Sequence, residues 1–289
     1  MRNISILIPA YNYECTALVR TLQRQAASLP GNYEILVADD GSTNTNVIAR
    51  NRAINQLPHC RLLECSPNKG RACVRNYLAR QAQYEWLLFL DCDMEVSDAD
   101  FLQHYDETTG YDVVDGGIRI GGDSLLLQGN IRYLYEHHVE RHHTAAERSK
   151  HPYRSFRTTN FMVARHVMQE HPFNEQFRYY GYEDVLFGKE LQQSNTSIVH
   201  IDNPTMLTDY ETNPVFISKT EEGLRTLYQF RTEIGDYSHL LVLSEKIPRR
   251  VVRLWHRLFG RWERKILVGT HPSLAVFNLY KLGYFVSLF

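Results

Sequence analysis

Two carboxylates separated by one residue, Asp91 and Asp93, directly follow the apolar run Trp86–Leu90. A short apolar run of this kind predicts a buried strand, so both acids should lie where that strand ends. Their oxygens could surround Mn²⁺ or Mg²⁺, ions that prefer oxygen ligands and accept substrate phosphates as the rest of their shell. We therefore predict a metal site at Asp91 and Asp93 that neutralises the charge of a departing diphosphate. A solvated acidic loop is the alternative interpretation.

A second pair of carboxylates, Glu183 and Asp184, follows the aromatic and glycine-containing segment Tyr180-Gly181-Tyr182. A carboxylate can remove the proton from a reacting hydroxyl group, and aromatic faces suit the apolar side of a sugar ring. We predict that Asp184 is a general base and that Glu183 binds the acceptor, although the sequence allows these two roles to be exchanged. The alternative is that both acids only stabilise the start of a helix through its dipole.

Basic residues cluster at the predicted start of a helix over Gly70–Gln83, namely Lys69, Arg71 and Arg75. A helix N-terminus together with arginine side chains makes a good anion site. A solvated helix face is the alternative, but Arg71 and Arg75 would then repel each other mildly across one helical turn. The chain has no GxGxxG and no GxxxxGK[ST] motif, so neither a dinucleotide site nor a P-loop is supported.

Polar residues also end two earlier strand-like runs, in the segments Pro9-Ala10-Tyr11-Asn12 and Asp39-Asp40-Gly41-Ser42. In open α/β sheets, ligands bind at the carboxyl ends of the strands. Tyr11 could stack on a base, and Asp40 could accept hydrogen bonds from a base or a ribose. For the second segment, a turn followed by a helix N-cap is an equally good interpretation.

The elements expected to position these residues alternate along the first part of the chain, which favours a mostly parallel sheet with helices on both faces. The predicted strands are Ile4–Pro9, Tyr33–Ala38, Arg61–Glu64 and Trp86–Leu90, and the predicted helices are Cys15–Leu29, Val47–Gln56 and Gly70–Gln83. Further along we predict a strand pair with a Gly-Gly turn over Tyr111–Ile120, a helix over Leu125–Ser149, a strand leading into a helix over Ser155–Val167, a helix over Glu183–Gln193 and a strand over Ser197–Ile201. From Pro214 to Phe289 the pattern is helical.

Taken in order, these motifs resemble those of the family-2 glycosyltransferases, which have a GT-A-type nucleotide-sugar domain. The resemblance rests on SILIPAYN, VADDGS, NKGRACVRN and LFLDCDM, then on Asn160-Phe161-Met162, Pro172–Phe177 and Tyr180–Asp184, and it covers roughly residues 3–205. It implies a GT-A-like α/β domain at 1–213, with a donor half at 1–95 and an acceptor half at 96–213. A helical C-terminal appendage would follow at 214–289.

The resemblance also implies roles for single residues. Residues at the positions of Pro9, Tyr11, Asn12 and Asp40 line the nucleoside pocket in that family, Asp93 would contact the metal directly, and Asp91 would face the ribose or a metal-bound water. We assign Asn160 to the acceptor site together with the segment 180–182. The implied reaction is an inverting transfer of a hexosyl or N-acetylhexosaminyl group from a nucleoside-diphosphate sugar, with a UDP-sugar as the expected donor, to a hydroxyl of a glycan or a lipid-linked acceptor.

A third metal ligand in GT-A enzymes is often a histidine downstream of the Glu-Asp motif, and His200 is the candidate here. His200 flanks a predicted strand, so a structural role is an equal alternative. Relatives are expected to carry a histidine shortly after an Asn-Pro pair, whereas Asn203-Pro204 is followed by Thr205-Met206-Leu207. The identity of the third ligand therefore stays open.

Composition narrows the partners and the location. The formal net charge of -1 gives no argument for nucleic acid, and five cysteines without a CxxC pair argue against a disulfide framework or a zinc site and favour the cytoplasm. The segment Lys246–Lys265 carries eight Lys or Arg residues interleaved with apolar ones, as in a basic amphipathic helix on an anionic membrane. We predict peripheral contact with the inner face of the cytoplasmic membrane through 246–289; packing on the catalytic domain or on a second subunit is the alternative.

Two other functions compete with the transferase. One is a catalytically inactive scaffold that binds nucleotide sugars, against which the intact Asp91, Asp93 and Asp184 argue. The other is a nucleotidyltransferase, which should open with a glycine-rich phosphate loop where this chain has Pro9-Ala10-Tyr11-Asn12.

Overall fold

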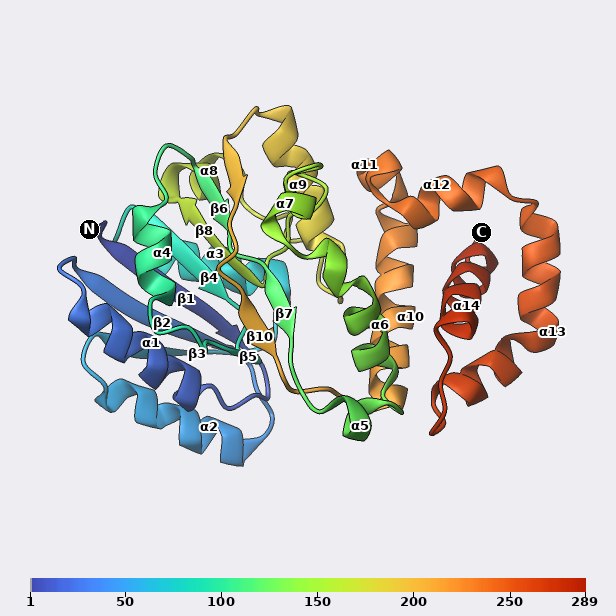
Figure 1. Cartoon of the computed structure of the whole chain (residues 1–289), viewed down its shortest axis with the longest axis horizontal. Helices are drawn as coiled ribbons and strands as arrows, with labels where there is room; N and C mark the ends of the chain where they lie inside the picture. The colour runs from blue at the N-terminus through green and yellow to red at the C-terminus, as the bar shows by residue number, and fades with distance from the viewer. Residues whose placement is uncertain (1) are drawn as a thin grey trace.

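A seven-stranded sheet forms the centre of the α/β region in this computed structural model, which describes residues 2–289 (Figure 1). The strand order is β3-β2-β1-β4-β8-β6-β9. Four of the six strand pairings are parallel, and β8 runs antiparallel to both of its neighbours. The strands are β1 (Ile4–Ala10), β2 (Tyr33–Asp40), β3 (Cys60–Cys65), β4 (Trp86–Leu90), β6 (Val113–Asp115), β8 (Asn160–Ala164) and β9 (Ile198–His200).

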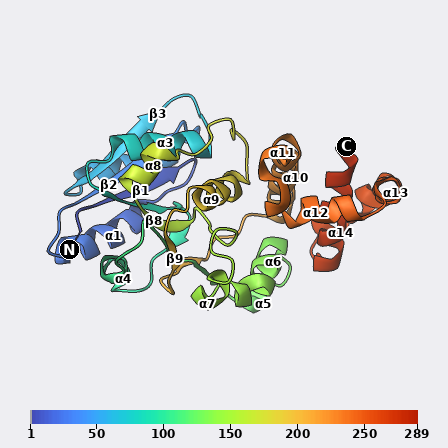
Figure 2. The same ribbon diagram turned by 90° about the horizontal axis from the view of Figure 1, so that it is seen from above.

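Helices cover both faces of this sheet, as the nearly continuous apolar strands predict. Alternate residues of β1 and β2 enter two separate cores: Ile6 and Ile35 face one, while Leu7 and Leu36 face the other. Helices α1 and α4 pack on the first face, and α3, α8 and α9 pack on the second (Figure 2). These helices are α1 (Thr16–Ser28), α2 (Thr45–Asn51, continued by a 3-10 turn over Arg52–Gln56), α3 (Arg71–Gln81), α4 (Phe101–Glu107), α8 (Arg165–Glu170) and α9 (Glu183–Gln193).

A second, three-stranded sheet lies beside the first and has the order β5-β10-β7. Its strands are β5 (Met94–Glu95), β7 (Ile118–Ile120) and β10 (Thr205–Leu207). The predicted strand pair over Tyr111–Ile120 is wrong, because β6 and β7 join different sheets. A Cβ at Gly116 would lie 2.4 Å from the hydroxyl of Tyr105, and Gly117 has a φ of +80°. The two glycines thus carry the chain through a crowded crossing between the sheets instead of forming a hairpin.

The single helix expected over Leu125–Ser149 is broken into shorter pieces. They are α5 (Ser124–Leu127), α6 (Ile131–Val139), a 3-10 turn (Glu140–His142) and α7 (Ala145–Arg148). Asn130 ends one piece and starts the next, since its side chain accepts a hydrogen bond from the Tyr133 amide at 2.9 Å. Thr144 caps α7 in the same way. These capping side chains compete with a continuous helix.

Helices alone form the C-terminal region, as the sequence predicts (Figure 1). Helix α10 lies next to the α/β part, and α12 to α14 form the end of the molecule farthest from the N-terminus. The helices are α10 (Asn213–Gln229), α11 (Arg231–Ile234), a 3-10 turn (Gly235–Tyr237), α12 (His239–Lys246), α13 (Arg249–Leu267) and α14 (Leu274–Ser287). None of the helices described within residues 2–289 has both the length and the hydropathy needed to cross a membrane.

Candidate active site

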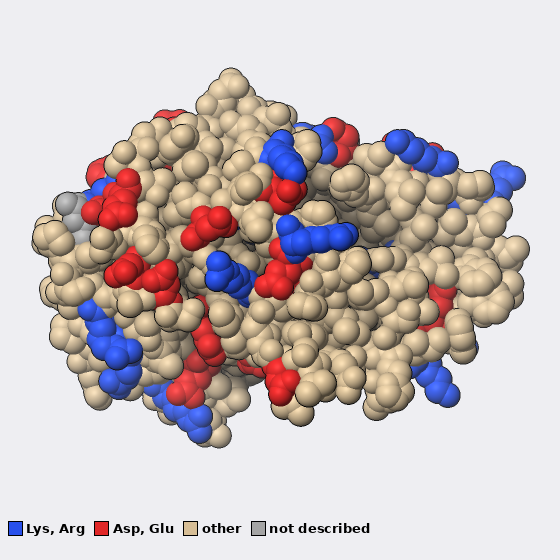
Figure 3. Space-filling view, viewed as in Figure 1, with Lys and Arg blue, Asp and Glu red and all other residues tan. Residues whose placement is uncertain are grey.

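Two adjoining cavities open at the carboxyl ends of β1, β2 and β4, the edge where ligands bind in open α/β sheets. The first has a volume of about 350 Å³ and the second about 460 Å³. Four residues line both cavities and therefore mark their junction: Arg71, Asp91, Asp93 and Tyr180. Acidic and basic side chains gather along the middle of the face shown in Figure 3.

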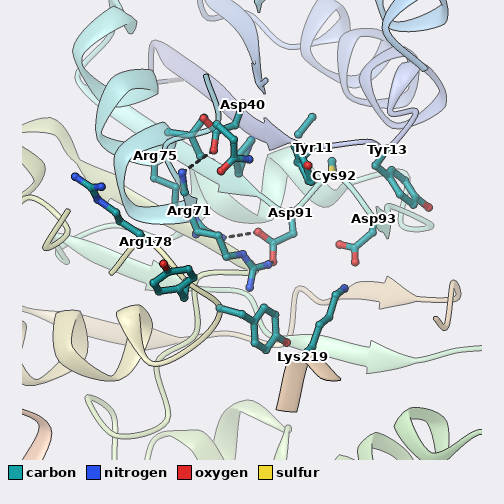
Figure 4. Close-up of a pocket in the computed structure, with 17 residues that line it drawn as sticks. Tyr11, Tyr13, Asp40, Arg71, Arg75, Asp91, Cys92, Asp93, Arg178 and Lys219 are labelled. Atoms are coloured by element: carbon teal, nitrogen blue, oxygen red, sulfur yellow. Dashed lines mark hydrogen bonds and ion pairs between the residues drawn. The ribbon is translucent and has the colours of Figure 1, made fainter. Parts of the chain in front are cut away.

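The first cavity contains several of the predicted donor-binding residues. Pro9 and Tyr11, at the end of β1, line it together with Asp40 at the end of β2 (Figure 4). The carboxylate of Asp40 accepts hydrogen bonds from the amides of Lys69 at 3.0 Å and Gly70 at 2.8 Å. Burial raises the pKa of Asp40, and these two hydrogen bonds oppose the rise. Asp40 therefore fixes the loop that leads into α3.

Gly70 brings a second segment to this cavity. It has a φ of +92°, and a Cβ there would lie 2.6 Å from the carbonyl oxygen of Arg178. Only glycine allows both that backbone conformation and so close an approach. The segment Arg178-Tyr179-Tyr180 consequently lines the first cavity beside the start of α3.

Asn12 and Lys69, also predicted to bind the donor, do not line either cavity. The side-chain oxygen of Asn12 accepts hydrogen bonds from the amides of Thr43 and Asn44 at 2.8 and 2.9 Å, so it ties the loops after β1 and β2 together. The side chain of Lys69 is exposed outside the cavities, and its backbone amide contacts Asp40. Both residues shape the loops that surround the site.

The two arginines of α3 connect the end of β4 to the start of α9. Arg75, only 1% exposed, lies 2.6 Å from the carboxylate of Asp91 and 3.4 Å from that of Glu183. Arg71 lies farther from the same two groups, at 3.8 and 3.9 Å, and its side chain is 42% exposed. Arg71 can therefore reach a bound ligand, whereas Arg75 is committed to the protein carboxylates. These carboxylates also offset the mutual repulsion of the two arginines.

Asp93 is the carboxylate at the junction that has no ion-pair partner among residues 2–289. Among the ion pairs of residues 2–289, Asp91 is paired with Arg75 and Arg71 but none involves Asp93. Burial and the charge of Asp91 raise the pKa of Asp93, while Arg132 and Arg71 lower it. Burial raises the pKa of Tyr13, and the nearby charges of Asp209 and Asp93 add to the rise.

This arrangement fits a divalent ion only if a substrate completes its shell. Within residues 2–289, no group of three or more His, Cys, Asp or Glu side chains is placed to hold a metal alone. Asp93 offers oxygen ligands at the cavity junction, and a diphosphate in the first cavity would supply more. The residues thus fit Mn²⁺ or Mg²⁺ bound together with a nucleotide.

Asp184 lines the second cavity, which it shares with Asp93. Burial and the charge of Glu183 raise the pKa of Asp184 to about 6, whereas Arg157 opposes the rise. Its neighbour Glu183 is buried and held by Arg75. The two residues before this pair have positive φ angles, 92° at Gly181 and 70° at Tyr182, so the backbone makes a turn that most residues do not adopt. This turn places Asp184 at the cavity wall, with the segment 180–182 lining the same wall.

Asn160 does not line the second cavity, although the sequence predicts it as an acceptor-binding residue. It is buried, and its side-chain amide donates hydrogen bonds to the carbonyl oxygens of Gly117 and Asn203, both at 2.9 Å. Its side-chain oxygen accepts a hydrogen bond from the hydroxyl of Tyr105 at 2.6 Å. Asn160 therefore holds the crossing between the two sheets together.

His200, the predicted third metal ligand, is buried away from both cavities. Its Nδ1 lies 2.8 Å from Arg148, and its Nε2 lies 2.8 Å from the carbonyl oxygen of Pro152. The carboxylate of Asp115 is 3.6 Å from the ring. Both ring nitrogens of His200 are therefore engaged within the protein, and the ring does not face Asp93 across either cavity.

Five basic residues that were not predicted line the cavities, and Arg132, Arg157 and Lys219 are three of them. Arg132 and Arg157 face the second cavity, and Lys219 enters the first from α10 (Figure 4). Arg132 is paired with Glu211, whereas Arg157 forms no ion pair among the described residues and lies 3.4 Å from the Nε2 of His143. The sequence around these residues carries no motif, so only their positive charge could have signalled them.

Comparison with known families identifies a match that covers more than half of the chain. The model described as "Glycosyl transferase family 2" matches residues 5–174. Two relatives from Haemophilus influenzae, each described as an uncharacterized glycosyltransferase, are 34% identical over 90 and 92 residues. Each matched segment makes up 31% of this chain and 36% or 29% of the relative, so the match spans about a third of the relatives' length.

Solved structures resemble the chain over nearly its whole length. S. aureus TarS 1–349 in complex with UDP-GlcNAc aligns with a TM-score of 0.53 at 18% identity, covering 99% of this chain and 90% of that one. A mannosyltransferase from Pyrobaculum calidifontis in complex with GDP-Man and Mn²⁺ aligns with a TM-score of 0.54 at 11% identity, covering 98% and 84%. At such low identity these similarities establish the fold alone, and they confirm the predicted GT-A-type architecture.

Proposed function

We propose that this chain, which belongs to glycosyl transferase family 2, moves a sugar from a nucleoside-diphosphate donor to an acceptor hydroxyl with inversion at the anomeric carbon. The observation that carries the proposal is that Asp93 and Asp184 both line the second cavity, and that the first cavity adjoins it at Asp93. A cation-binding acid and a candidate base thus face one space in which a sugar could be transferred. The acceptor would be a glycan or a lipid-linked saccharide.

The donor would occupy the first cavity. Tyr11 is exposed at its wall and offers a ring on which a base can stack, and Arg71 presents a partly free guanidinium to a diphosphate. Mn²⁺ or Mg²⁺ at Asp93 would stabilise the negative charge that develops on the departing diphosphate. The solved structures similar in fold carry UDP-GlcNAc in one case and GDP-Man with Mn²⁺ in another, which supports this class of donor. We propose a UDP-sugar.

Asp184 is the base that we propose. It accepts the proton of the acceptor hydroxyl, whose oxygen forms a bond to the anomeric carbon as the bond from that carbon to the diphosphate oxygen breaks. A pKa near 6 leaves Asp184 ionised at neutral pH yet more basic than an ordinary aspartate. Glu183 is unsuited to this role because Arg75 and Arg71 hold its carboxylate. Its proposed role is to position α3 against α9.

The test is the release of nucleoside diphosphate from a panel of nucleotide sugars with Mn²⁺ and candidate acceptors. We expect turnover with one donor class, a product of opposite anomeric configuration by NMR, and a loss of roughly 10²–10⁴-fold in Asp184→Asn. The control is Glu190→Gln, an acid on the same helix that lines neither cavity. Donor binding in a thermal-shift measurement without any turnover would instead support the inactive scaffold.

A further inference from the structure

Helix α13 presents an unusual outer surface at the end of the molecule farthest from the N-terminus (Figure 1). At about 100° per residue, its exposed side chains fall into two adjoining sectors. One sector is basic and contains Arg250, Arg253, Arg257 and Arg261, with Lys265 at its edge. The other is apolar and contains Val251, Leu254, Trp255, Leu258, Phe259 and Trp262.

The remaining side of α13 is the one that packs against the protein. Gly260, Glu263 and Leu267 are buried there. Glu263 is the only acidic residue of the helix, is 1% exposed, and accepts a hydrogen bond from Trp255 at 2.7 Å. The exposed surface of α13 therefore carries positive charge and no negative charge. In Figure 3, basic side chains lie at the edge of a largely uncharged surface at this end of the molecule.

Packing on the catalytic domain does not account for the apolar sector. Val251 and Leu258 are each 65% exposed, and Trp262 is 57% exposed. A helix that serves only as a packed appendage buries its apolar stripe and turns its charged side to water. Here the apolar stripe faces outward, next to a row of arginines. Apolar side chains beside basic ones, with tryptophan among them, are typical of helices that lie in a lipid headgroup region.

We propose that α13 docks the protein on an anionic lipid surface. The apolar sector would enter the boundary between headgroups and acyl chains, and Arg253, Arg257 and Arg261 would contact lipid phosphates. Charge complementarity selects this partner, because a row of arginines without ion pairs among residues 2–289 attracts an anionic surface and repels a second copy of the same helix.

Docking at α13 also fixes the direction in which the catalytic cavities face. Arg264 of α13 is paired with Glu221 of α10 at 2.8 Å, and the hydroxyl of Tyr280 donates to the same carboxylate at 2.7 Å. Lys219, two residues earlier on α10, lines the first cavity. The docking helix and the cavity wall thus belong to one packed unit, which would hold the site at a set orientation to the lipid.

The test is co-sedimentation of the full chain with vesicles of phosphatidylcholine, with or without phosphatidylglycerol. We expect binding only to the anionic vesicles, a blue shift of tryptophan emission, and weaker binding as salt is raised. Each basic residue near such a surface strengthens binding roughly fivefold, so R253E/R257E should lower the partition coefficient by more than tenfold. Leu258→Ser with Trp262→Ser should remove the blue shift.

The matched control is R20E/R24E on α1, which reverses two exposed arginines at the same spacing on a different helix. The proposal predicts unchanged vesicle binding for this variant, and circular dichroism verifies folding of all variants. The proposal would be overturned if R20E/R24E lost as much vesicle binding as R253E/R257E, or if the parent chain bound neutral and anionic vesicles equally well. Light scattering could also contradict the proposal. It would do so if the parent chain were a dimer, and if the Leu258→Ser, Trp262→Ser variant were monomeric but still bound vesicles. Because vesicle binding needs no turnover, its outcome is independent of the proposed transferase reaction.

Discussion

Helices α3 and α13 both carry arginines four residues apart, yet the two sets have opposite surroundings. In α3, Arg75 is buried against Asp91 and Glu183 at 2.6 and 3.4 Å. In α13, Arg253 and Arg257 are exposed and form no ion pair within residues 2–289. The same residue type at the same spacing therefore builds the site in one helix and is left available to an outside anion in the other.

Arg71 lies between these two extremes. It is close enough to Asp91 and Glu183 to be held in place, but its longer distances of 3.8 and 3.9 Å and its 42% exposure leave part of its charge facing the first cavity. The degree to which protein carboxylates neutralise an arginine thus predicts what its loss should affect: the fold, the reaction or the docking surface.

The largest expected effect is on stability, in Arg75→Met. Removing Arg75 leaves Asp91 and Glu183 buried without their main partner, and breaking a buried pair in this way costs about 3–5 kcal/mol. The matched variant Arg257→Met should change the free energy of unfolding by less than about 0.5 kcal/mol, as is usual for surface substitutions. Urea denaturation of both variants measures the difference. If the two variants lost similar amounts of unfolding free energy, the arginines of α3 and α13 would not differ in their contribution to stability.

The second effect is on the reaction, in Arg71→Met. We expect kcat/KM for the donor to fall by about two orders of magnitude, the usual cost of losing one group that stabilises transition-state charge. Stability should change little, because the ion pairs of Arg71 are long and partly exposed. Steady-state release of nucleoside diphosphate gives the rate, with Arg24→Met, an exposed arginine of α1 outside both cavities, as the control that should match the parent chain. If Arg71→Met instead lowered the stability and left kcat/KM unchanged, Arg71 would have a structural role like that of Arg75.

Most of the residues that line the first cavity could be identified from the sequence because their signals are local. Apolar runs fix the strands, and polar residues directly after them, such as Asp40 and Asp91, must lie at the same sheet edge. The pattern of α13 is local as well, since one helix contains both of its sectors. For these features, a short stretch of sequence is enough to predict which residues lie together.

Local sequence did not predict the surroundings of three polar residues, Asn12, Asn160 and His200. Each is a polar residue at or just beyond the end of a strand, as a ligand-binding residue would be, but its hydrogen-bond partners come from elsewhere in the chain. Asn160 bonds to Gly117 and Asn203, each 43 residues away. Local sequence cannot show whether such a side chain is satisfied internally, and a polar group that is already satisfied is unavailable to a ligand.

The smallest expected effect is a shift of the pH profile, and it concerns Arg157, an arginine of the second cavity that lacks an ion pair among the described residues. Asp184 must be ionised to act as a base, so kcat should rise with pH through about 6, the pKa that burial and Glu183 give it. Arg157 lowers this pKa by favouring the charged form. In Arg157→Gln the pKa should rise, and the ascending limb of the profile should move to higher pH, so that more activity is lost at pH 6 than at pH 8. Measuring kcat across this range distinguishes the shift from a loss of acceptor binding, which would raise KM at every pH and leave the midpoint unmoved.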